Sequence, residues 1–466
     1  MAGQRGEFGS KLGFVLAAAG SAVGLGNIWK FPFEVGRGGG AAFVLVYLMF
    51  CFVLCFPVMV TEIAIGRKTN RNPVGAFIEL GHKKWSLVGK LGLFCGVLIL
   101  SFYNVVAGWA FGYFLEMVQG NFAIGDHFGE FVSDWSTVGL YGLLFMIATA
   151  TIVSGGVKGG IERASKILMP TLLIIILFLA GYAFTLPNAM AGVEFYLLPD
   201  FSKLDGNVIY GALGQAFFSL SLGMGALITY GSYVSKRENV ISSAAMITLT
   251  DVGIAFIAGL MMFPFVFSQG IEPTGGAGLI FITLPGIFQS LGPSLGIFIG
   301  SLFFMLLSFA ALTSTVSLLE VPVSYLVDEH KLPRKTAVWG TAGFIFIIGI
   351  PSLLANGASD FFTNFMFIPG DNVAGYDGYT DFMTIIGYIA NDTLLPLGGL
   401  LISSFAAYVW KKENLNEEIK IGYSGYSGSF VESFVNFAIT YLCPVILGLV
   451  FVFTLLDRFV GIHLVG

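Results

Sequence analysis

Long apolar stretches, each of the length that a membrane helix needs, occur throughout this 466-residue chain. A helix must supply about 20 apolar residues to cross a hydrocarbon core of about 30 Å. Only 11% of the residues are charged, whereas a soluble domain carries roughly a quarter. The sequence therefore predicts an all-α polytopic membrane protein with one transmembrane domain over residues 1–466. We expect eleven spans, at approximately residues 11–36, 41–66, 88–118, 137–155, 163–185, 207–234, 239–268, 294–327, 335–356, 381–410 and 430–457.

The basic residues predict the orientation of the chain. If the N-terminus is cytoplasmic, all but four of the 23 lysines and arginines fall on the inner side, as the positive-inside rule requires. The four exceptions are Lys30, Arg37, Lys203 and Arg458. An odd number of spans then places the C-terminus outside. We expect a multi-pass protein of the cell membrane in contact with lipid, and the net charge of −5 gives no reason to expect nucleic acid as a partner.

Two of the predicted spans, the first and the sixth, contain a pair of glycines near the middle. These pairs are Gly24 with Gly26 and Gly223 with Gly225. Glycine weakens a helix by about 1 kcal/mol relative to alanine, and backbone groups freed inside a membrane need other partners. Close packing through small residues could explain one such segment. Two of them, five spans apart and in opposite orientations, favour the discontinuous helices of an inverted-repeat transporter. The two repeats would cover about residues 11–185 and 207–410, followed by an extra helix at about 430–457.

Polar side chains are expected at the same depth as these glycine pairs. Asp251 lies about 18 Å from the inner end of the seventh predicted span, at 1.5 Å per residue, and Thr313 and Ser314 lie near the middle of the eighth. A charge at that depth costs several kcal/mol unless it is paired. Asp251 is therefore a candidate functional residue, and a protonated aspartic acid that is hydrogen-bonded in the bundle is the alternative.

The groups expected at this depth favour certain ligands over others. Carbonyls, hydroxyls, the Asn27 amide and the Asp251 carboxylate form an oxygen-only set that suits Na⁺, whereas zinc or copper would favour His or Cys. Amides at the N-terminus of a half-helix favour a carboxylate, and carbonyls at a C-terminus favour an ammonium group. Such a site suits a zwitterion such as an amino acid. The bulky Tyr103 and Phe218 argue against a continuous channel pore, and the sequence has no nucleophile–base or metal motif that would indicate an enzyme.

Several segments around these positions resemble the neurotransmitter:sodium symporter family, and among its members the bacterial leucine-transporter type. The matching segments are AGSAVGLGNIWKFP at 19–32, GGGA at 38–41 with Tyr47, EIAIGR at 62–67, GGIERASKILMP at 159–170, GQAFFSLSLGMG at 214–225 and FAALTS at 309–314. The resemblance implies a sodium-coupled symporter that imports neutral, hydrophobic or aromatic L-amino acids by alternating access. Proton-coupled amino acid transport is the alternative, because Asp251 could titrate. The family usually has twelve spans, so a chain of eleven leaves the oligomeric state open.

The resemblance also implies two sodium sites and a substrate site. The first sodium site would use Ala22, Asn27, Ser219 and Asp251, together with the substrate carboxylate. The second would use Gly20, Val23, Ala310, Thr313 and Ser314. The substrate would contact Ala22, Leu25, Gly26, Ile99, Tyr103, Phe218, Ser219, Ser221, Met224, Ser314 and Leu318. Because the substrate carboxylate is itself a sodium ligand, each would bind better when the other is present.

Two pairs of charges, one glycine–proline segment and two departures from the family pattern concern gating and specificity. An outer gate would pair Lys30 with Asp381, an inner gate would pair Arg5 with Asp328 near Tyr233, and the fifth helix would unwind between Gly160 and Pro170. From the residues alone, such charges can simply be solvated, and such glycines and prolines can serve packing. Met224 stands where relatives often carry Phe and is adaptable, so we expect a pocket that accepts large apolar side chains. Asp251 stands where the leucine-transporter type has an amide, and Ala255 offers no side chain for an anion, so we expect no chloride requirement.

Overall fold

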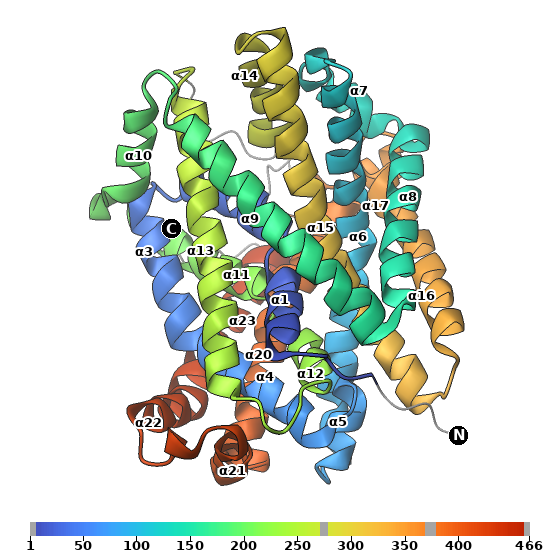
Figure 1. Ribbon diagram of the computed structural model, residues 1–466, viewed down its shortest axis with the longest axis vertical. Helices are drawn as coiled ribbons and strands as arrows, with labels where there is room; N and C mark the ends of the chain where they lie inside the picture. Colours follow the sequence, from blue (N-terminus) through green and yellow to red (C-terminus); the bar gives the residue numbers. More distant parts are fainter. Residues whose placement is uncertain (1–5, 271–277, 369–378, 461–466) are drawn as a thin grey trace.

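The computed structural model describes residues 6–270, 278–368 and 379–460. The long helices α6 (Ser86–Val118), α13 (Val240–Phe267) and α15 (Pro293–Glu329) run roughly along the long axis of the molecule, and α9 (Arg163–Ala183) crosses them obliquely (Figure 1). The helices α5 (Pro73–Glu79), α12 (Ala226–Gly231), α21 (Lys412–Gly422) and α22 (Phe430–Phe437) lie at one end, whereas α7 (Phe128–Ser133), α10 (Ala189–Leu197) and α14 (Leu284–Ser290) lie at the opposite end (Figure 1). We refer to these as the inner and outer ends, following the predicted orientation.

The first half of the described chain is helical, with α-helices interrupted by π-helical and 3₁₀ segments, labelled η. Its elements are α1 (Lys11–Ala22), η1 (Gly26–Lys30), α2 (Phe31–Arg37), α3 (Ala41–Phe50), η2 (Cys51–Cys55), α4 (Phe56–Thr69), α5 (Pro73–Glu79), η3 (Lys83–Trp85), α6 (Ser86–Val118), η4 (Phe122–Gly125), α7 (Phe128–Ser133), α8 (Trp135–Ser154), η5 (Val157–Glu162), α9 (Arg163–Ala183), α10 (Ala189–Leu197) and η6 (Phe201–Lys203).

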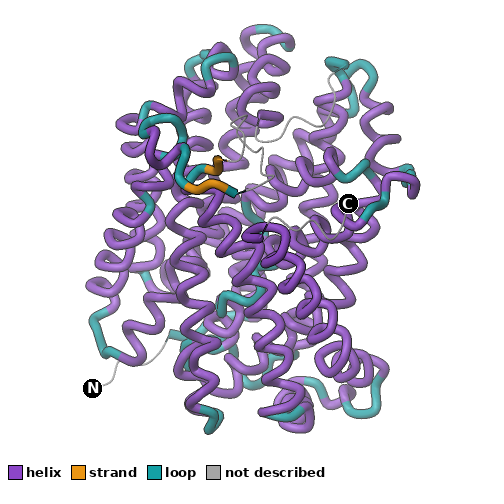
Figure 2. Tube along the Cα trace, turned by 180° about the vertical axis from the view of Figure 1, so that it is seen from behind, coloured by secondary structure: helices purple, strands orange, loops and turns teal. Residues whose placement is uncertain are grey.

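The second half adds one short β-hairpin on the outer side to a further set of helices (Figure 2). Its elements are α11 (Gly206–Ser219), α12 (Ala226–Gly231), α13 (Val240–Phe267), η7 (Leu279–Thr283), α14 (Leu284–Ser290), α15 (Pro293–Glu329), α16 (Arg334–Ile348), α17 (Ile350–Leu354), α18 (Asp360–Thr363), β1 (Met366–Phe367), β2 (Tyr379–Thr380), α19 (Phe382–Gly387), η8 (Tyr388–Leu394), α20 (Leu395–Ser404), η9 (Phe405–Val409), α21 (Lys412–Gly422), η10 (Ser424–Tyr426), α22 (Phe430–Phe437), η11 (Ala438–Leu442), α23 (Cys443–Leu455) and η12 (Leu456–Val460). The antiparallel hairpin pairs Met366 with Thr380 and Phe367 with Tyr379.

Within the described ranges, nine continuous helices are long and apolar enough to cross a membrane. They are Ala41–Thr69, Lys83–Val118, Trp135–Ser154, Val157–Ala183, Val240–Phe267, Pro293–Glu329, Arg334–Leu354, Phe382–Val409 and Phe430–Phe459. The bent pair Lys11–Ala22 and Gly26–Arg37 makes a tenth. The remaining expected span, 207–234, consists of the two short helices α11 and α12. The fifth span begins at Val157, earlier than expected, because the residues after Gly156 form a π-helical turn and not a loop.

Prolines explain most of the π-helical turns inside these helices. Five such segments are each followed, two residues later, by a proline: Pro32, Pro57, Pro285, Pro396 and Pro444. Proline has no N–H and its ring clashes with the carbonyl of the preceding turn. A wider turn before the proline relieves that clash and lets the helix continue. The apolar spans therefore remain continuous through prolines that would otherwise break them.

Small residues place α1 in the interior of the bundle. Ala17, Ala18 and Ala19 are almost completely buried, and α1 packs against α9, α13 and α15. Without large side chains its backbone can approach these neighbours closely. At Gly20, for example, a Cβ atom would lie 3.4 Å from Cβ of Thr313 on α15. The backbone of α1 is thus available to a site in the middle of the molecule.

Candidate functional site

The first helix is interrupted immediately after Ala22. Val23 is extended, and the axes of Lys11–Ala22 and Gly26–Arg37 differ by 51°. The amides at the break find side-chain partners: Gly24 N–H donates to Asn27 Oδ1 (3.1 Å) and Leu25 N–H donates to the Tyr103 hydroxyl (2.9 Å). Position 24 has to be glycine, because a Cβ there would lie 2.3 Å from Ser314 Oγ. The polar backbone is therefore stabilised in the non-helical form.

The sixth helix is interrupted between Ser219 and Ala226. Ser221, Gly223 and Gly225 have positive φ angles of 54°, 83° and 77°. Such angles favour glycine, and two of these three residues are glycine. Gly223 N–H donates to Oε1 of the fully buried Glu62 at 2.8 Å. This carboxylate belongs to the EIAIGR segment, and no role was expected for it from the sequence. Its position shows that α4 supports the interrupted backbone of the sixth helix.

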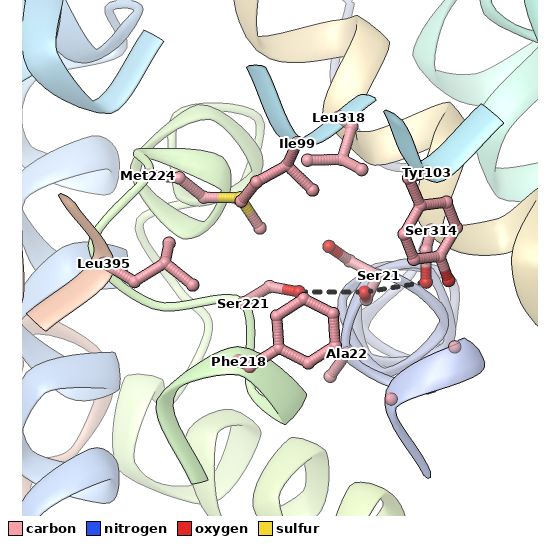
Figure 3. A pocket seen from close by; sticks show the side chains of 12 residues that line it. Ser21, Ala22, Ile99, Tyr103, Phe218, Ser221, Met224, Ser314, Leu318 and Leu395 are labelled. Atoms are coloured by element: carbon pink, nitrogen blue, oxygen red, sulfur yellow. Dashed lines mark hydrogen bonds between the residues drawn. The ribbon is translucent and has the colours of Figure 1, made fainter. Parts of the chain in front are cut away.

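A cavity lies between the two interruptions (Figure 3). It is lined by Ser21, Ala22, Gly24, Gly26, Ile99, Tyr103, Phe218, Ser221, Met224, Ser314, Leu318 and Leu395. Of the residues expected at the substrate site, Leu25 and Ser219 are absent from this lining: Leu25 contacts Tyr103 through its amide, and Ser219 faces Asp251. Ser21, Gly24 and Leu395 line the cavity although they were not expected there.

The cavity has a polar side and an apolar side. On the polar side, the Ser21 carbonyl accepts hydrogen bonds from Ser221 Oγ (3.0 Å) and Ser314 Oγ (3.2 Å) (Figure 3). The remaining wall is made by the side chains of Ile99, Met224, Leu318 and Leu395 (Figure 3). A molecule that fits would need polar groups at one end and an apolar body at the other.

Asp251 is the centre of a buried polar cluster beside the cavity. Its carboxylate is fully buried and accepts hydrogen bonds from Asn27 Nδ2 (2.7 Å), Ser219 Oγ (2.9 Å) and the Tyr47 hydroxyl (3.5 Å). Gln215 Nε2 donates to the Gly26 carbonyl at 2.8 Å and anchors the start of η1 nearby. Three of the four residues expected at the first sodium site, Asn27, Ser219 and Asp251, thus contact one another, while Ala22 lines the cavity. Tyr47 and Gln215 were not expected there.

A second cluster of oxygen atoms joins α1 to α15. Thr313 Oγ1 lies 3.2 Å from the Val23 carbonyl and 2.9 Å from the Ala310 carbonyl. Gly20 lies against Thr313, as described above. The hydroxyl of Ser314 bonds to Ser21 and lines the cavity. Four of the five residues expected at the second sodium site therefore meet at Thr313, and Ser314 bridges from there to the cavity.

The outer charges are arranged differently from expectation. Lys30 Nζ lies over the Phe218 ring, 4.6 Å from its centroid, and no ion pair joins it to Asp381, although both residues are in the described part of the chain. The Asp381 carboxylate instead caps α19 through Thr384, at 2.9 Å from its amide and 2.6 Å from its hydroxyl. The expected Lys30–Asp381 pair is thus not formed in this structure: Lys30 contacts Phe218, and Asp381 caps α19.

A different aspartate of the tenth span forms an ion pair. The Asp392 carboxylate is 3.4 Å from Arg458 Nε on the last helix, and Asp392 lies three residues before the cavity residue Leu395. The charged group of the tenth span that pairs with a basic residue is therefore Asp392, and its partner is Arg458.

Hydrogen bonds and an ion pair join the residues around Asp328 and Tyr233 on the inner side. Arg5 lies outside the described residues, and its expected partner Asp328 accepts bonds from the backbone amide (3.1 Å) and side chain (3.3 Å) of Asn72. The Tyr233 hydroxyl donates to Glu320 Oε1 at 2.7 Å, and Glu320 pairs with Arg334 at 2.5 Å. The sequence did not indicate Glu320 or Arg334, because they contact only through tertiary structure.

The segment between Gly160 and Pro170 is helical in this structure. Gly160 lies in the π-helical turn η5, where a Cβ would be 1.9 Å from the Ile152 carbonyl oxygen. Pro170 lies inside α9, which continues past it to Ala183. The expected unwinding therefore appears here only as a widened first turn, which ends at Glu162.

Comparison with known proteins decides the family. The model of the sodium:neurotransmitter symporter family matches residues 5–134 and 134–459. The chain belongs to this family. It is 36% identical to an uncharacterised sodium-dependent transporter, YhdH, of Bacillus subtilis, over 96% of both chains. It is 26% identical to the human sodium- and chloride-dependent GABA transporter 2, over 76% of this chain and 68% of that protein.

The fold is also that of a solved structure. The crystal structure of MhsT in complex with L-phenylalanine matches with a TM-score of 0.87 and 41% identity, over 96% of this chain and 99% of MhsT. The predicted fold class, a helical multi-pass membrane protein, is thereby confirmed, and so is the expected family. The family consists of sodium-dependent transporters and not of enzymes.

Proposed function

We propose that this family member is a sodium-coupled symporter that imports neutral, hydrophobic or aromatic L-amino acids by alternating access. The observation that carries the proposal is the cavity between two interrupted helices, with backbone dipoles on one side and an apolar wall on the other. A second observation supports it: the buried carboxylate of Asp251 lies next to that cavity, through its contacts with Asn27 and Ser219.

Both ends of a zwitterion find complementary groups in this arrangement. Gly26 begins the outer half of the first helix, and its amide lies at the positive end of the dipole of that half, which suits a carboxylate. The Tyr103 hydroxyl reaches the same place. The carbonyls at the ends of α1 and α11, including Ala22, Phe218 and Ser219, would accept bonds from the ammonium group.

The apolar wall supports a large side chain as the variable part of the substrate. Ile99, Met224, Leu318 and Leu395 carry no charge, and Met224 can adapt its shape. MhsT, a protein of the same fold, holds L-phenylalanine in its crystal structure. We therefore propose phenylalanine, tyrosine, tryptophan and the branched aliphatic amino acids as substrates of this chain.

The donor sets of the two clusters fit Na⁺. Carbonyl, hydroxyl, amide and carboxylate oxygens are hard ligands, and each cluster combines several of them within hydrogen-bond distance of one another. Two sodium ions would bind here, the first with Ala22, Asn27, Ser219 and Asp251, the second with Gly20, Val23, Ala310, Thr313 and Ser314. Sodium ions held there would supply positive charge beside the substrate carboxylate.

The neighbourhood of Asp251 also bears on anions and protons. Its carboxylate already accepts the hydroxyl donors of Ser219 and Tyr47, so a chloride ion would meet a fixed negative charge at this place. We therefore propose that transport needs no chloride. Proton coupling is the second candidate, since Asp251 is buried among neutral donors and could exchange a proton.

Uptake into proteoliposomes tests the proposal. Purified protein is reconstituted and loaded without sodium, and radiolabelled L-phenylalanine is added outside with Na⁺ or with choline at the same pH. Concentrative uptake that requires the sodium gradient is expected. Uptake driven by a pH gradient without sodium would favour proton coupling, and uptake that never exceeds equilibration would refute a symporter. Competition by unlabelled amino acids, with glycine as the control, would test the expected preference for large side chains.

The orientation remains a proposal as well. From the distribution of basic residues we propose a cytoplasmic N-terminus, an external C-terminus and a location in the cell membrane. Fusion of alkaline phosphatase to the C-terminus, active only outside the cytoplasm, would show activity if this orientation is right and none if the C-terminus is inside.

A further inference from the structure

A buried carboxylate connects the beginning of the fifth span to the beginning of the first. Glu162, the last residue of η5, is 2% exposed. Its Oε2 accepts a hydrogen bond from the Gly9 amide at 2.6 Å, and its Oε1 accepts bonds from Ser10 Oγ at 3.3 Å and Lys166 Nζ at 2.6 Å. Ser10 is also the N-cap of α1, where its hydroxyl accepts from the Gly13 amide. The carboxylate therefore contacts the residues that start α1.

The neighbouring glycine shows how closely the two elements approach. A Cβ atom at Gly13 would lie 2.1 Å from Glu162 Oε1, so any larger residue would displace the carboxylate. Gly9 also approaches it, with a Cβ position 3.3 Å from both carboxylate oxygens. A carboxylate at a helix N-terminus is favoured by the free amides and by the helix dipole. Glu162 is thus the counter-charge of the inner end of α1.

We infer that Glu162 is a positioning residue that latches the inner half of the first helix in the closed state. The inference rests on the proposed alternating-access function, in which an inner path must open. The inner half of this helix ends at Ala22, which lines the cavity, and the next residue, Val23, contacts Thr313 through its carbonyl. Displacement of the inner half would therefore separate Val23 from Thr313. For that displacement to happen, the Glu162–Gly9 bond has to break.

The position of Glu162 in the chain links this latch to the fifth helix. Glu162 ends the π-helical turn that contains Gly160, and Arg163 begins the regular helix α9. The direction of a side chain from a helix axis depends on the winding of the turn that carries it. A change in the winding of η5 would turn the Glu162 carboxylate away from Gly9. One local event would then open the start of the fifth helix and release the first.

Hydrogen exchange measured by mass spectrometry on the full chain in lipid nanodiscs tests the latch. Glu162→Gln should raise deuterium uptake several-fold in peptides that cover residues 9–14 and leave peptides of α15 unchanged. Lys166→Gln, which removes only a partner of the carboxylate, should give a smaller rise in the same peptides. Glu162→Asp keeps the charge and should restore part of the protection. The exposed neighbour Arg163 supplies the control, because Arg163→Gln leaves every contact of Glu162 in place.

The outcomes separate the latch from the transport proposal. Unchanged exchange of residues 9–14 in both Glu162→Gln and Lys166→Gln would overturn the latch, whatever the uptake assay shows. An equal rise in all helices of Glu162→Gln, with none in Lys166→Gln, would indicate a folding defect and would also overturn it. If the local rise occurs, half-saturation of uptake by external Na⁺ should shift several-fold upward, because the inward-open state becomes more populated. Loss of all uptake in the unsubstituted protein would refute the symporter and not the contact.

Discussion

The Tyr103 hydroxyl is expected to take part in two hydrogen bonds, one that stabilises the fold and one that binds the substrate. It accepts the Leu25 amide at 2.9 Å, at the break in the first helix, and it is proposed to donate to the substrate carboxylate. In Tyr103→Phe the buried amide loses its partner, which costs about 1–3 kcal/mol of folding stability. A lost bond to a charged group costs about 1.5–3 kcal/mol of binding. The dissociation constant for L-phenylalanine should therefore rise roughly 10- to 100-fold.

Tyr113→Phe is the matched control on the same helix. Its hydroxyl donates to the Ile124 carbonyl at 3.1 Å, in an equally buried place that does not line the cavity. This variant should lose roughly 1 kcal/mol of stability and keep its affinity within about twofold. Binding of radiolabelled L-phenylalanine to purified protein in saturating Na⁺, together with thermal unfolding, measures both quantities. Equal affinities of the unsubstituted protein and Tyr103→Phe would refute the carboxylate contact.

Further predictions concern the fifth helix and the ions. Gly160→Ala should lower the midpoint of thermal unfolding, since its Cβ would lie 1.9 Å from the Ile152 carbonyl oxygen. Gly159 has open space around it, so Gly159→Ala should be neutral or should stabilise the fold by up to about 1 kcal/mol. Equal effects of the two substitutions would contradict the close approach. Thr313→Val keeps the shape of the side chain but removes an oxygen ligand. The Na⁺ concentration for half-maximal uptake should rise about tenfold if about 1.4 kcal/mol of Na⁺ binding energy is lost. An unchanged sodium dependence would exclude Thr313 from a sodium site. Replacing chloride by gluconate should leave uptake unaltered because Asp251 already supplies the negative charge, and a steep loss would show that an anion is required.

The sequence predicted the centre of the molecule well because local backbone chemistry determines it. The glycine pairs lie where the first and sixth helices are interrupted, since a close approach to Ser314 at Gly24 and a positive φ angle at Gly223 disfavour other residues. Residues next to these breaks, such as Asn27 and Ser219, are then brought together by the breaks themselves. The motifs that carried the resemblance also lie there, so the fold class and the lining of the cavity could be anticipated from them.

The tenth span shows why other parts could not be predicted. Its seven-residue π-helical segment, Tyr388–Leu394, changes the direction of every residue after it, so helical periodicity does not reveal that Leu395 faces the cavity. Asp381 looked like a gate residue, but its place at the start of α19 makes it a cap. The partner of Asp392, Arg458, lies more than sixty residues further along the chain, and only tertiary structure brings the two together.

The dependence of substrate binding on sodium tests the central proposal most directly. If a zwitterion and Na⁺ share the space between the interrupted helices, each must strengthen the binding of the other by the same factor. Equilibrium binding of radiolabelled L-phenylalanine to the purified protein should therefore tighten steadily as Na⁺ replaces choline at constant ionic strength and pH. Binding that is equally strong in choline and in Na⁺ would contradict the account.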